Sequence, residues 1–407
     1  MQKVQSALDS EGFTKRTKGI AERVKGITVS AIKEMALLAM KEKDTISLSW
    51  GLPSFKTPEH IREATKEALD REEDIGKYTQ PPFGLKELRD LIAEDFRKRF
   101  DRDIDPDNQI IIHAGAMQGV YSAIHTLVDT GDEVIMTDPG FSSHREQIKL
   151  AGGKIVWWPL NENDNWGLDV DKLEDLITPK TKLLIIVNPS NPTGSVFSEE
   201  SLRKVASIAQ KHDIFIISDE PYDFLVFNGD KHFSIAQIEE CKDNVIYIGS
   251  LSKKYAMTGW RIGYSVAEEG LRNQIMKVHD ATVICASTVC QYGAIAAMKG
   301  SQDCVGKFHD EFEKRREILY KRLEKVNKIF SFKKTDGAYY VFPRIEANHN
   351  DSYEFAIRLL KEAKVVTVPG AAFGPSGEHH VRITFCGSRE DINEAFDRLE
   401  VWQRENC

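Results

Sequence analysis

The strongest constraint on the fold is a regular alternation of apolar and amphipathic segments that begins at Ile110. The apolar runs predict buried strands, and the segments between them carry apolar residues on one helical face. Strands that are apolar on both faces and separated by such helices are typical of a mostly parallel sheet covered on both sides. We expect strands at 110–113, 133–136, 154–158, 183–187, 214–218 and from Val245, with helices near 120–127, 142–151, 169–177 and 199–211.

The segments on either side of this alternation predict a second, smaller domain. Residues 1–45 have a helical pattern whose apolar face is formed by Val29, Ile32, Ala36, Leu37 and Met40. Beyond residue 300, longer helices alternate with short strands, which is typical of an α+β unit, at 307–328, 353–363, 365–368 and 381–385. We therefore expect a large domain over 47–289, and a small domain that joins 1–46 to 290–407.

Composition excludes several classes of partner. The 407 residues include 55 basic and 63 acidic side chains, and the net charge of −8 argues against nucleic acid or an anionic membrane as the main partner. The six cysteines have neither the close pairs of a zinc site nor the density of a disulfide scaffold, so we expect no metal and a cytoplasmic protein. No window is long and apolar enough to predict a membrane span.

Polar side chains gather where three consecutive predicted strands end. NPSNPTG at 188–194 follows one strand, Asp219 and Tyr222 follow the next, and a turn from Ser250 to Lys253 follows the third. Ligands of parallel sheets bind at the carboxyl ends of the strands. The sequence therefore predicts one site built from these three ends.

The last of these ends predicts a site for a phosphorylated aldehyde. Lys253 lies in a small polar turn after a buried strand, and Arg261 follows eight residues later. A lysine and an arginine at this spacing usually belong to a solvated surface, so the pattern depends on its surroundings. The amine is a nucleophile for an aldehyde, and Ser250 and Arg261 suit a phosphate. The turn formed by Ala114, Gly115 and Ala116 precedes a helix and offers its free N–H groups to the same anion.

The three strand ends together match the needs of pyridoxal 5'-phosphate. Asp219 supplies the carboxylate that keeps the pyridine nitrogen protonated, which makes the ring an electron sink. Asn191 and Tyr222 suit the phenolic oxygen of the ring. Lys253 would form the imine with the aldehyde and then move the α-proton of the substrate as a base. Lys254 competes for this role, but its spacing to Ser250 and Arg261 fits less well.

Across nearly its whole length the chain resembles the class I/II aminotransferases, which are fold-type-I pyridoxal-phosphate enzymes with a mostly parallel large domain and a smaller α+β domain. The resemblance is carried in order by GKYTQPPFG at 76–84, NPSNPTG, SDEPY at 218–222, SLSKKYAMTGWRIGY at 250–264, the PGAAFG run at 369–374 and VRITF at 381–385.

The resemblance implies a role for individual residues. Lys253 is the Schiff-base lysine, Asp219 faces the pyridine nitrogen, and Asn191 and Tyr222 contact the phenolate. Arg382 clamps the substrate α-carboxylate, aided by Gly51 and Asn191. Phe141 stacks an aromatic ring on the cofactor, and Tyr78 reaches the phosphate of the neighbouring subunit of a homodimer. The full set of remaining cofactor contacts is Gly115, Ala116, Met117, Phe141, Ser250, Arg261 and Tyr78.

The resemblance also implies the reaction, an amino-group transfer from an amino acid to a 2-oxo acid by a ping-pong cycle. Relatives that prefer acidic side chains often have a basic residue where this chain has Met117. Apolar or aromatic donors are therefore favoured by Met117, Phe141, Trp50 and Tyr339, with His144 and Arg145 as alternatives that would recognise a polar group. Two other functions remain open, a lyase on the same scaffold and, more remotely, a cofactor-sensing transcription regulator.

Overall fold

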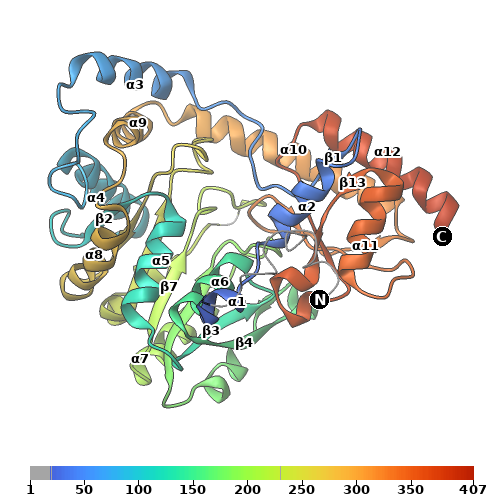
Figure 1. Ribbon diagram of the computed structural model, residues 1–407, viewed down its shortest axis with the longest axis horizontal. Helices are drawn as coiled ribbons and strands as arrows, with labels where there is room; N and C mark the ends of the chain where they lie inside the picture. Colours follow the sequence, from blue (N-terminus) through green and yellow to red (C-terminus); the bar gives the residue numbers. More distant parts are fainter. Residues whose placement is uncertain (1–18, 20, 230) are drawn as a thin grey trace.

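The computed structural model describes residue 19, residues 21–229 and residues 231–407. Its centre is an eight-stranded sheet (Figure 1). Across the sheet the order is β2 (Ile110–His113), β9 (Gly263–Val266), β8 (Val245–Ser250), β7 (Phe215–Asp219), β6 (Thr181–Val187), β3 (Glu133–Asp138), β4 (Lys154–Asn161) and β5 (Gly167–Leu168). Strands β8, β7, β6, β3 and β4 are parallel to one another. The pairs β8 with β9, β9 with β2, and β4 with β5 are antiparallel. The prediction of a mostly parallel α/β sheet is confirmed.

Successive residues of the strands belong to separate cores on the two faces of the sheet. Leu184 and Ile186 pack in one core, whereas Leu183 and Ile185 pack in the other. The first face also holds apolar side chains of α4 (Lys86–Phe100) and α7 (Glu199–Lys211), and the second those of α5 (Ala116–Leu127), α6 (Ser142–Ala151) and α8 (Glu269–Val283). Because both faces are buried, these strands are continuously apolar.

The prediction of a helix at 169–177 is wrong. This segment forms two short 3-10 turns, Val170–Lys172 and Glu174–Leu176. Trp158 Nε1 donates a hydrogen bond of 2.9 Å to the carbonyl of Asp169, so the first carbonyl of the segment is already used. The amphipathic pattern correctly indicated that one side of this segment is buried against the sheet, but the segment does not form a regular α-helix.

A smaller set of elements packs around a core of its own. It contains α10 (Asp303–Lys325), α11 (Ser352–Arg358) and α12 (Arg389–Asn406), with a three-stranded antiparallel sheet of β11 (Tyr340–Val341), β15 (Val381–Thr384) and β14 (Val368–Pro369). Short pairs β1 (Ile46–Ser47) with β13 (Val365–Val366), and β10 (Phe330–Ser331) with β12 (Arg344–Ile345), complete it. The helix expected at 307–328 begins four residues earlier and ends three residues earlier. The boundaries between the two domains stay a prediction.

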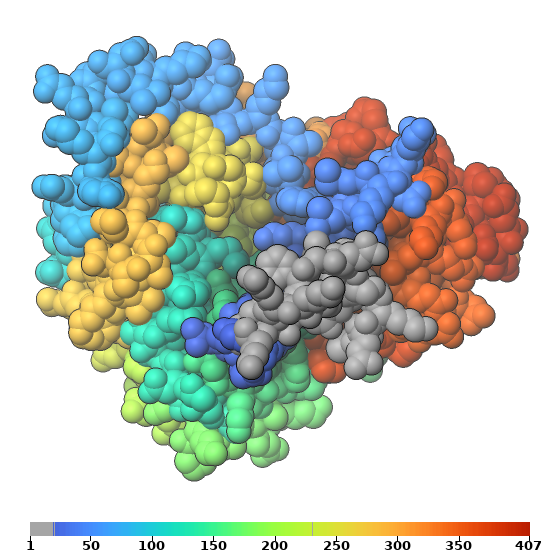
Figure 2. All heavy atoms as spheres, in the orientation of Figure 1, coloured from blue at the N-terminus to red at the C-terminus, as the bar shows by residue number. Residues whose placement is uncertain are grey.

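The N-terminal segment contains two helices, α1 (Glu22–Lys25) and α2 (Ala31–Ala39), while residues 1–18 of the expected helical region lie outside the described part. Met35 of α2 packs with Ala356, Leu360 and Val366 of the smaller set. The segment contacts both parts of the molecule, with α1 against α6 and α2 against β13 and β14. Figure 2 shows blue atoms of this segment beside the red C-terminal elements. In the described part of the chain, no helix has the length and apolar character needed to cross a membrane.

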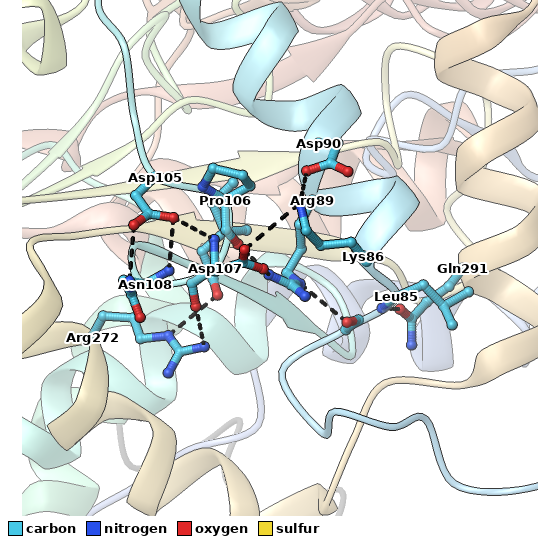
Figure 3. A network of polar contacts seen from close by, with 12 residues as sticks. Leu85, Lys86, Arg89, Asp90, Asp105, Pro106, Asp107, Asn108, Arg272 and Gln291 are labelled. Carbon is cyan, nitrogen blue, oxygen red and sulfur yellow. Dashed lines mark hydrogen bonds and ion pairs between the residues drawn. The ribbon is translucent and has the colours of Figure 1, made fainter.

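A polar network holds the loop that leads into β2. Asp105 Oδ1 accepts a hydrogen bond of 2.8 Å from the backbone N–H of Asp107, and the Asp107 carboxylate lies 2.7 Å from Arg89 Nη1. Arg272 of α8 donates to the carbonyls of Asp107 and Ile110, at 3.4 Å each (Figure 3). The network ties the start of β2 to α4 and α8. Two further helices, α3 (Glu59–Arg71) and α9 (Thr288–Lys299), lie beside it at the edge of the molecule (Figure 1).

Candidate active site

A cavity of about 200 Å³ lies at the carboxyl ends of β7 and β8, where the large sheet meets the smaller set of elements. Most of the residues expected in a site line it, namely Gly51, Ala116, Met117, Phe141, Asn191, Asp219, Tyr222, Ser250, Lys253, Arg261 and Arg382. The register explains this convergence, since Asp219 pairs with Val187 on one side and with Ile248 on the other. Three strand ends therefore open into one space, as expected for parallel strands.

Lys253 presents an amine of lowered pKa to this cavity. Its Nζ donates a hydrogen bond of 2.6 Å to the carbonyl of Gly51. Burial lowers the pKa of Lys253 to about 8, and the nearby charges of Arg382 and Arg261 act in the same direction. At neutral pH such a lysine has a larger fraction of neutral amine than an exposed one, and the neutral amine is the form that acts as nucleophile and base. Lys254 points elsewhere, with its Nζ 5.8 Å from the ring centre of Tyr255.

Asp219 ends β7 with a buried carboxylate. Its Oδ2 lies 3.1 Å from Nε2 of His144 on α6, while its Oδ1 has no hydrogen-bond partner among the described residues. A buried carboxylate oxygen without a partner is costly unless a donor approaches it. The protonated ring nitrogen of a pyridine is such a donor, so this carboxylate fits pyridoxal phosphate. His144 is fully buried against Asp219 rather than placed to recognise a substrate, which differs from the expectation.

Arg382 and two tyrosines form the wall that the smaller set contributes. Arg382 Nη1 donates a hydrogen bond of 3.0 Å to Asn191 Oδ1, and its Nη2 donates to the carbonyl of Ser49. The guanidinium lies 4.5 Å from the ring centre of Tyr340. Its Nε atom is buried and has no hydrogen-bond partner in the described part of the chain, so it is free to bind a carboxylate.

Tyr340 is a lining residue that the sequence prediction missed. Its hydroxyl lies 2.9 Å from the hydroxyl of Tyr222, and burial raises the pKa of Tyr222 well above its usual range, so both phenols stay protonated. Tyr339, which we expected beside the substrate, is buried behind Gly51. Its hydroxyl donates a hydrogen bond of 3.1 Å to the carbonyl of Gly51. The sequence shows two adjacent tyrosines at 339 and 340, and this pair was the only hint that an aromatic ring lines the site. The register of β11 decides that the ring of Tyr340 faces the cavity.

The phosphate end is formed by Arg261, Ser250 and the start of α5. Gly115 caps α5 with a φ of 85°, in the left-handed region that favours glycine. A Cβ at this position would lie 2.4 Å from Arg261 Nη2, so the turn and the guanidinium are packed against each other. The free N–H groups of a helix start and a guanidinium suit one phosphate dianion. Thr258 and Ser252 also line this end and were not predicted.

Three other expected residues, Tyr78, Trp50 and Arg145, are not part of the cavity lining. Tyr78 is 70% exposed, and Trp50 is 44% exposed. Neither contributes to the lining of its own chain. Arg145 is not part of the lining either, because its Nε donates to Glu146 at 2.7 Å. The apolar lining comes instead from Met117 and Phe141 with an unpredicted residue, Ile32 of α2.

The fold and this site define an α/β enzyme of the fold-type-I class, with a half-buried lysine and a buried carboxylate lining one cavity. The family model for aminotransferase class I and II matches residues 43–399. Aromatic-amino-acid aminotransferase 2 of Thermococcus litoralis is 39% identical over 383 residues, which cover 94% of this chain and 97% of that one. The aspartate aminotransferase of Pyrococcus abyssi is 38% identical over 388 residues, covering 95% and 98%.

Solved structures agree with the sequence comparisons. The aromatic aminotransferase from Pyrococcus horikoshii OT3 superposes with a TM-score of 0.85 at 37% identity, covering 92% of this chain and 99% of that one. The Thermus thermophilus aspartate aminotransferase with maleate has a TM-score of 0.89 at 30% identity, covering 94% and 99%. The chain therefore belongs to the class I and II aminotransferase family and is an aminotransferase. Members of this family generally depend on pyridoxal phosphate.

Proposed function

We propose that this aminotransferase uses pyridoxal 5'-phosphate to move an amino group from an apolar or aromatic amino acid to a 2-oxo acid by a ping-pong cycle. The observation that carries the proposal is that one cavity contains both Lys253, with its lowered pKa, and a carboxylate oxygen of Asp219 that has no hydrogen-bond partner among the described residues. When bound, the cofactor supplies the electron sink that stabilises a negative charge at the substrate Cα.

The polar residues of the site then each have a defined task. Asp219 holds a proton on the ring nitrogen, because its buried carboxylate favours the cationic form. Tyr222 and Asn191 donate to the phenolic oxygen. Lys253 removes the proton from the substrate Cα and returns it on the other side of the transferred nitrogen, which its lowered pKa permits near neutral pH. Arg382 binds the α-carboxylate through the nitrogen that lacks a partner within the described chain.

The lining supports an apolar or aromatic donor. Met117, Phe141 and Ile32 are among the residues that line the cavity. The cations of the lining, Lys253 and two arginines, already serve the aldehyde, the phosphate and the α-carboxylate. An acidic side chain would therefore be buried without a charge partner from this chain, which is costly. The relatives include both aromatic and aspartate aminotransferases, so the donor is inferred from the cavity alone.

The test is a half-reaction with the purified enzyme. Adding a suitable amino acid without any 2-oxo acid is expected to remove the absorbance of the lysine-bound cofactor, and 2-oxoglutarate is expected to restore it. Phenylalanine, tyrosine or leucine should react about tenfold faster than aspartate. Faster reaction of aspartate would refute the donor assignment and leave transamination intact. Release of pyruvate and ammonia from an amino acid with a leaving group at Cβ, such as serine or cysteine, would instead support a lyase.

A homodimer is part of the proposal. Tyr78 lies far more exposed than a packing aromatic would be, on a loop where the family places a contact to the neighbouring subunit's phosphate. Tyr78→Phe is expected to weaken cofactor binding without changing the sedimentation coefficient. Sedimentation that shows a fully active monomer would remove this role.

A further inference from the structure

A buried pair of histidines lies directly behind the phosphate end of the cavity. His113 is the last residue of β2, and His279 lies on α8. Their Nδ1 atoms are 3.1 Å apart, and both rings are buried. Nothing in the proposed catalytic cycle uses either ring, although His113 comes immediately before the turn at Ala114 to Ala116. Buried polar groups in such a position require an explanation.

The two rings converge on one amide oxygen. Gln118 Oε1 lies 2.8 Å from His113 Nδ1 and 3.1 Å from His279 Nδ1. On its other side, His113 Nε2 lies 2.8 Å from the hydroxyl of Ser265. One neutral tautomer of His113 satisfies its contacts to Ser265 and Gln118: the serine hydroxyl donates to Nε2, and Nδ1–H donates to the glutamine oxygen. Burial lowers the pKa of His113 to about 3 and that of His279 to about 4, so both rings remain neutral near pH 7.

This network connects the elements that carry the phosphate site. Gln118 belongs to the first turn of α5, directly after Ala116 and Met117, which line the cavity. Ser265 lies on β9, the strand that follows Arg261. His113 therefore links the helix start to the strand behind the guanidinium.

The packing around the ring is tight enough to transmit its position. A Cβ at Gly119 would lie 3.0 Å from the His113 ring, so α5 rests directly on the imidazole. A Cβ at Gly263 would lie 2.6 Å from the backbone nitrogen of Ala116, so β9 and the turn are equally close. Hydrogen bonds hold the His113 ring on two sides, and Gly119 packs against it on a third. The ring therefore restricts the turn at 114–116 to a single position.

We propose that His113 is a positioning residue that holds the first turn of α5 and the strand after Arg261 in register, and so sets the affinity of the site for the phosphate group. The inference rests on the proposed use of pyridoxal phosphate. It predicts a selective effect, because a displaced turn weakens contacts to the phosphate and leaves the lysine, Asp219 and the ring contacts in place. A ring that only fills the core would affect every ligand alike.

The experiment compares two ligands that differ only in the phosphate. The full chain freed of cofactor is titrated with pyridoxal 5'-phosphate and with pyridoxal, and the absorbance of the lysine-bound aldehyde gives both dissociation constants. His113→Phe keeps the ring volume and removes the hydrogen bonds. This variant is expected to raise the dissociation constant of pyridoxal phosphate by about tenfold and that of pyridoxal by less than about twofold.

Two further variants guard against a loss of folding. Ser265→Ala removes only the hydroxyl behind His113 and is expected to give the same selectivity at about threefold. Ser352→Ala is the matched control, because this buried serine accepts a hydrogen bond of 3.2 Å from the backbone of Ala371, away from the cavity. It is expected to leave both dissociation constants unchanged, and thermal unfolding of all variants reports the general cost in stability.

The outcomes separate this inference from the proposed function. If the wild-type chain binds pyridoxal phosphate and His113→Phe loses affinity for both ligands equally, the ring is a core residue and the inference is overturned. Unchanged constants in His113→Phe and Ser265→Ala overturn it as well. If the wild-type chain binds neither ligand, the proposed function fails and this inference fails with it.

Discussion

The rate at which the cofactor-free chain captures pyridoxal phosphate is expected to rise with pH to a midpoint near 8. Only the neutral amine attacks the aldehyde, and burial lowers the pKa of Lys253 from 10.5 to about 8. Near pH 7 a group with a pKa of about 8 is roughly 9% neutral, whereas one with a pKa of 10.5 is roughly 0.03% neutral. The structure therefore predicts capture about 300-fold faster than at an exposed lysine under the same conditions.

Stopped-flow absorbance between about pH 6 and about pH 11 measures this rate directly. Lys253→Ala is expected to lose the phase altogether, while Lys254→Ala is the matched control and should keep both its amplitude and its midpoint. Arg261 and Arg382 add to the lowering of the pKa, so the midpoint of Arg261→Met should move upward. A wild-type midpoint near 10.5, or a phase that survives Lys253→Ala, would refute the reasoning.

Three other substitutions test the remaining parts of the site. Asp219→Asn is expected to lower kcat by about a hundredfold or more with the cofactor still bound, because the ring nitrogen loses its anionic partner; the single-turnover rate measures this. Arg382→Gln should lower kcat/KM for every donor by about 10- to 100-fold through the loss of charge-assisted bonds to the α-carboxylate. Met117→Lys should raise kcat/KM for aspartate relative to phenylalanine, and an unchanged ratio would show that this residue does not select the donor.

Gly51 offers a test of packing rather than chemistry. A Cβ at this position would lie 2.1 Å from Tyr340 Oη, and Gly51 also accepts the hydrogen bond from Lys253. Gly51→Ala is therefore expected to cost about 1–3 kcal/mol in the free energy of unfolding, measured by denaturant titration. Gly76→Ala is the control, because a Cβ there meets nothing within 4 Å in the described structure. Equal stability of the two variants would contradict the observed contact.

Some of the site could be read from the order of residues alone. Continuous apolar runs predicted parallel strands, and parallel strands place their carboxyl ends together, so Asn191, Asp219 and Lys253 were expected in one site before any contact was known. The structure brings these three side chains into one cavity. The motifs that carry the family resemblance lie at the same strand ends, and the family match confirms that resemblance.

The finer arrangement was decided only in three dimensions. Periodicity tells which face of an element is buried, but not what it is buried against. His144 was an alternative for recognising a polar group of the substrate, and it lies beside Asp219 instead. The register of β11 selects Tyr340 over Tyr339 for the cavity, and neighbouring tyrosines in a sequence do not reveal this choice.

By itself, then, the sequence determined the kind of sheet, the family and the chemical groups at the strand ends, because these depend on local pattern and spacing. The lowered pKa of Lys253 and the histidine network behind the phosphate turn depend on groups far apart in the chain. His113 and His279 are separated by 166 positions. Burial and charge act through space, so only the tertiary structure decides them.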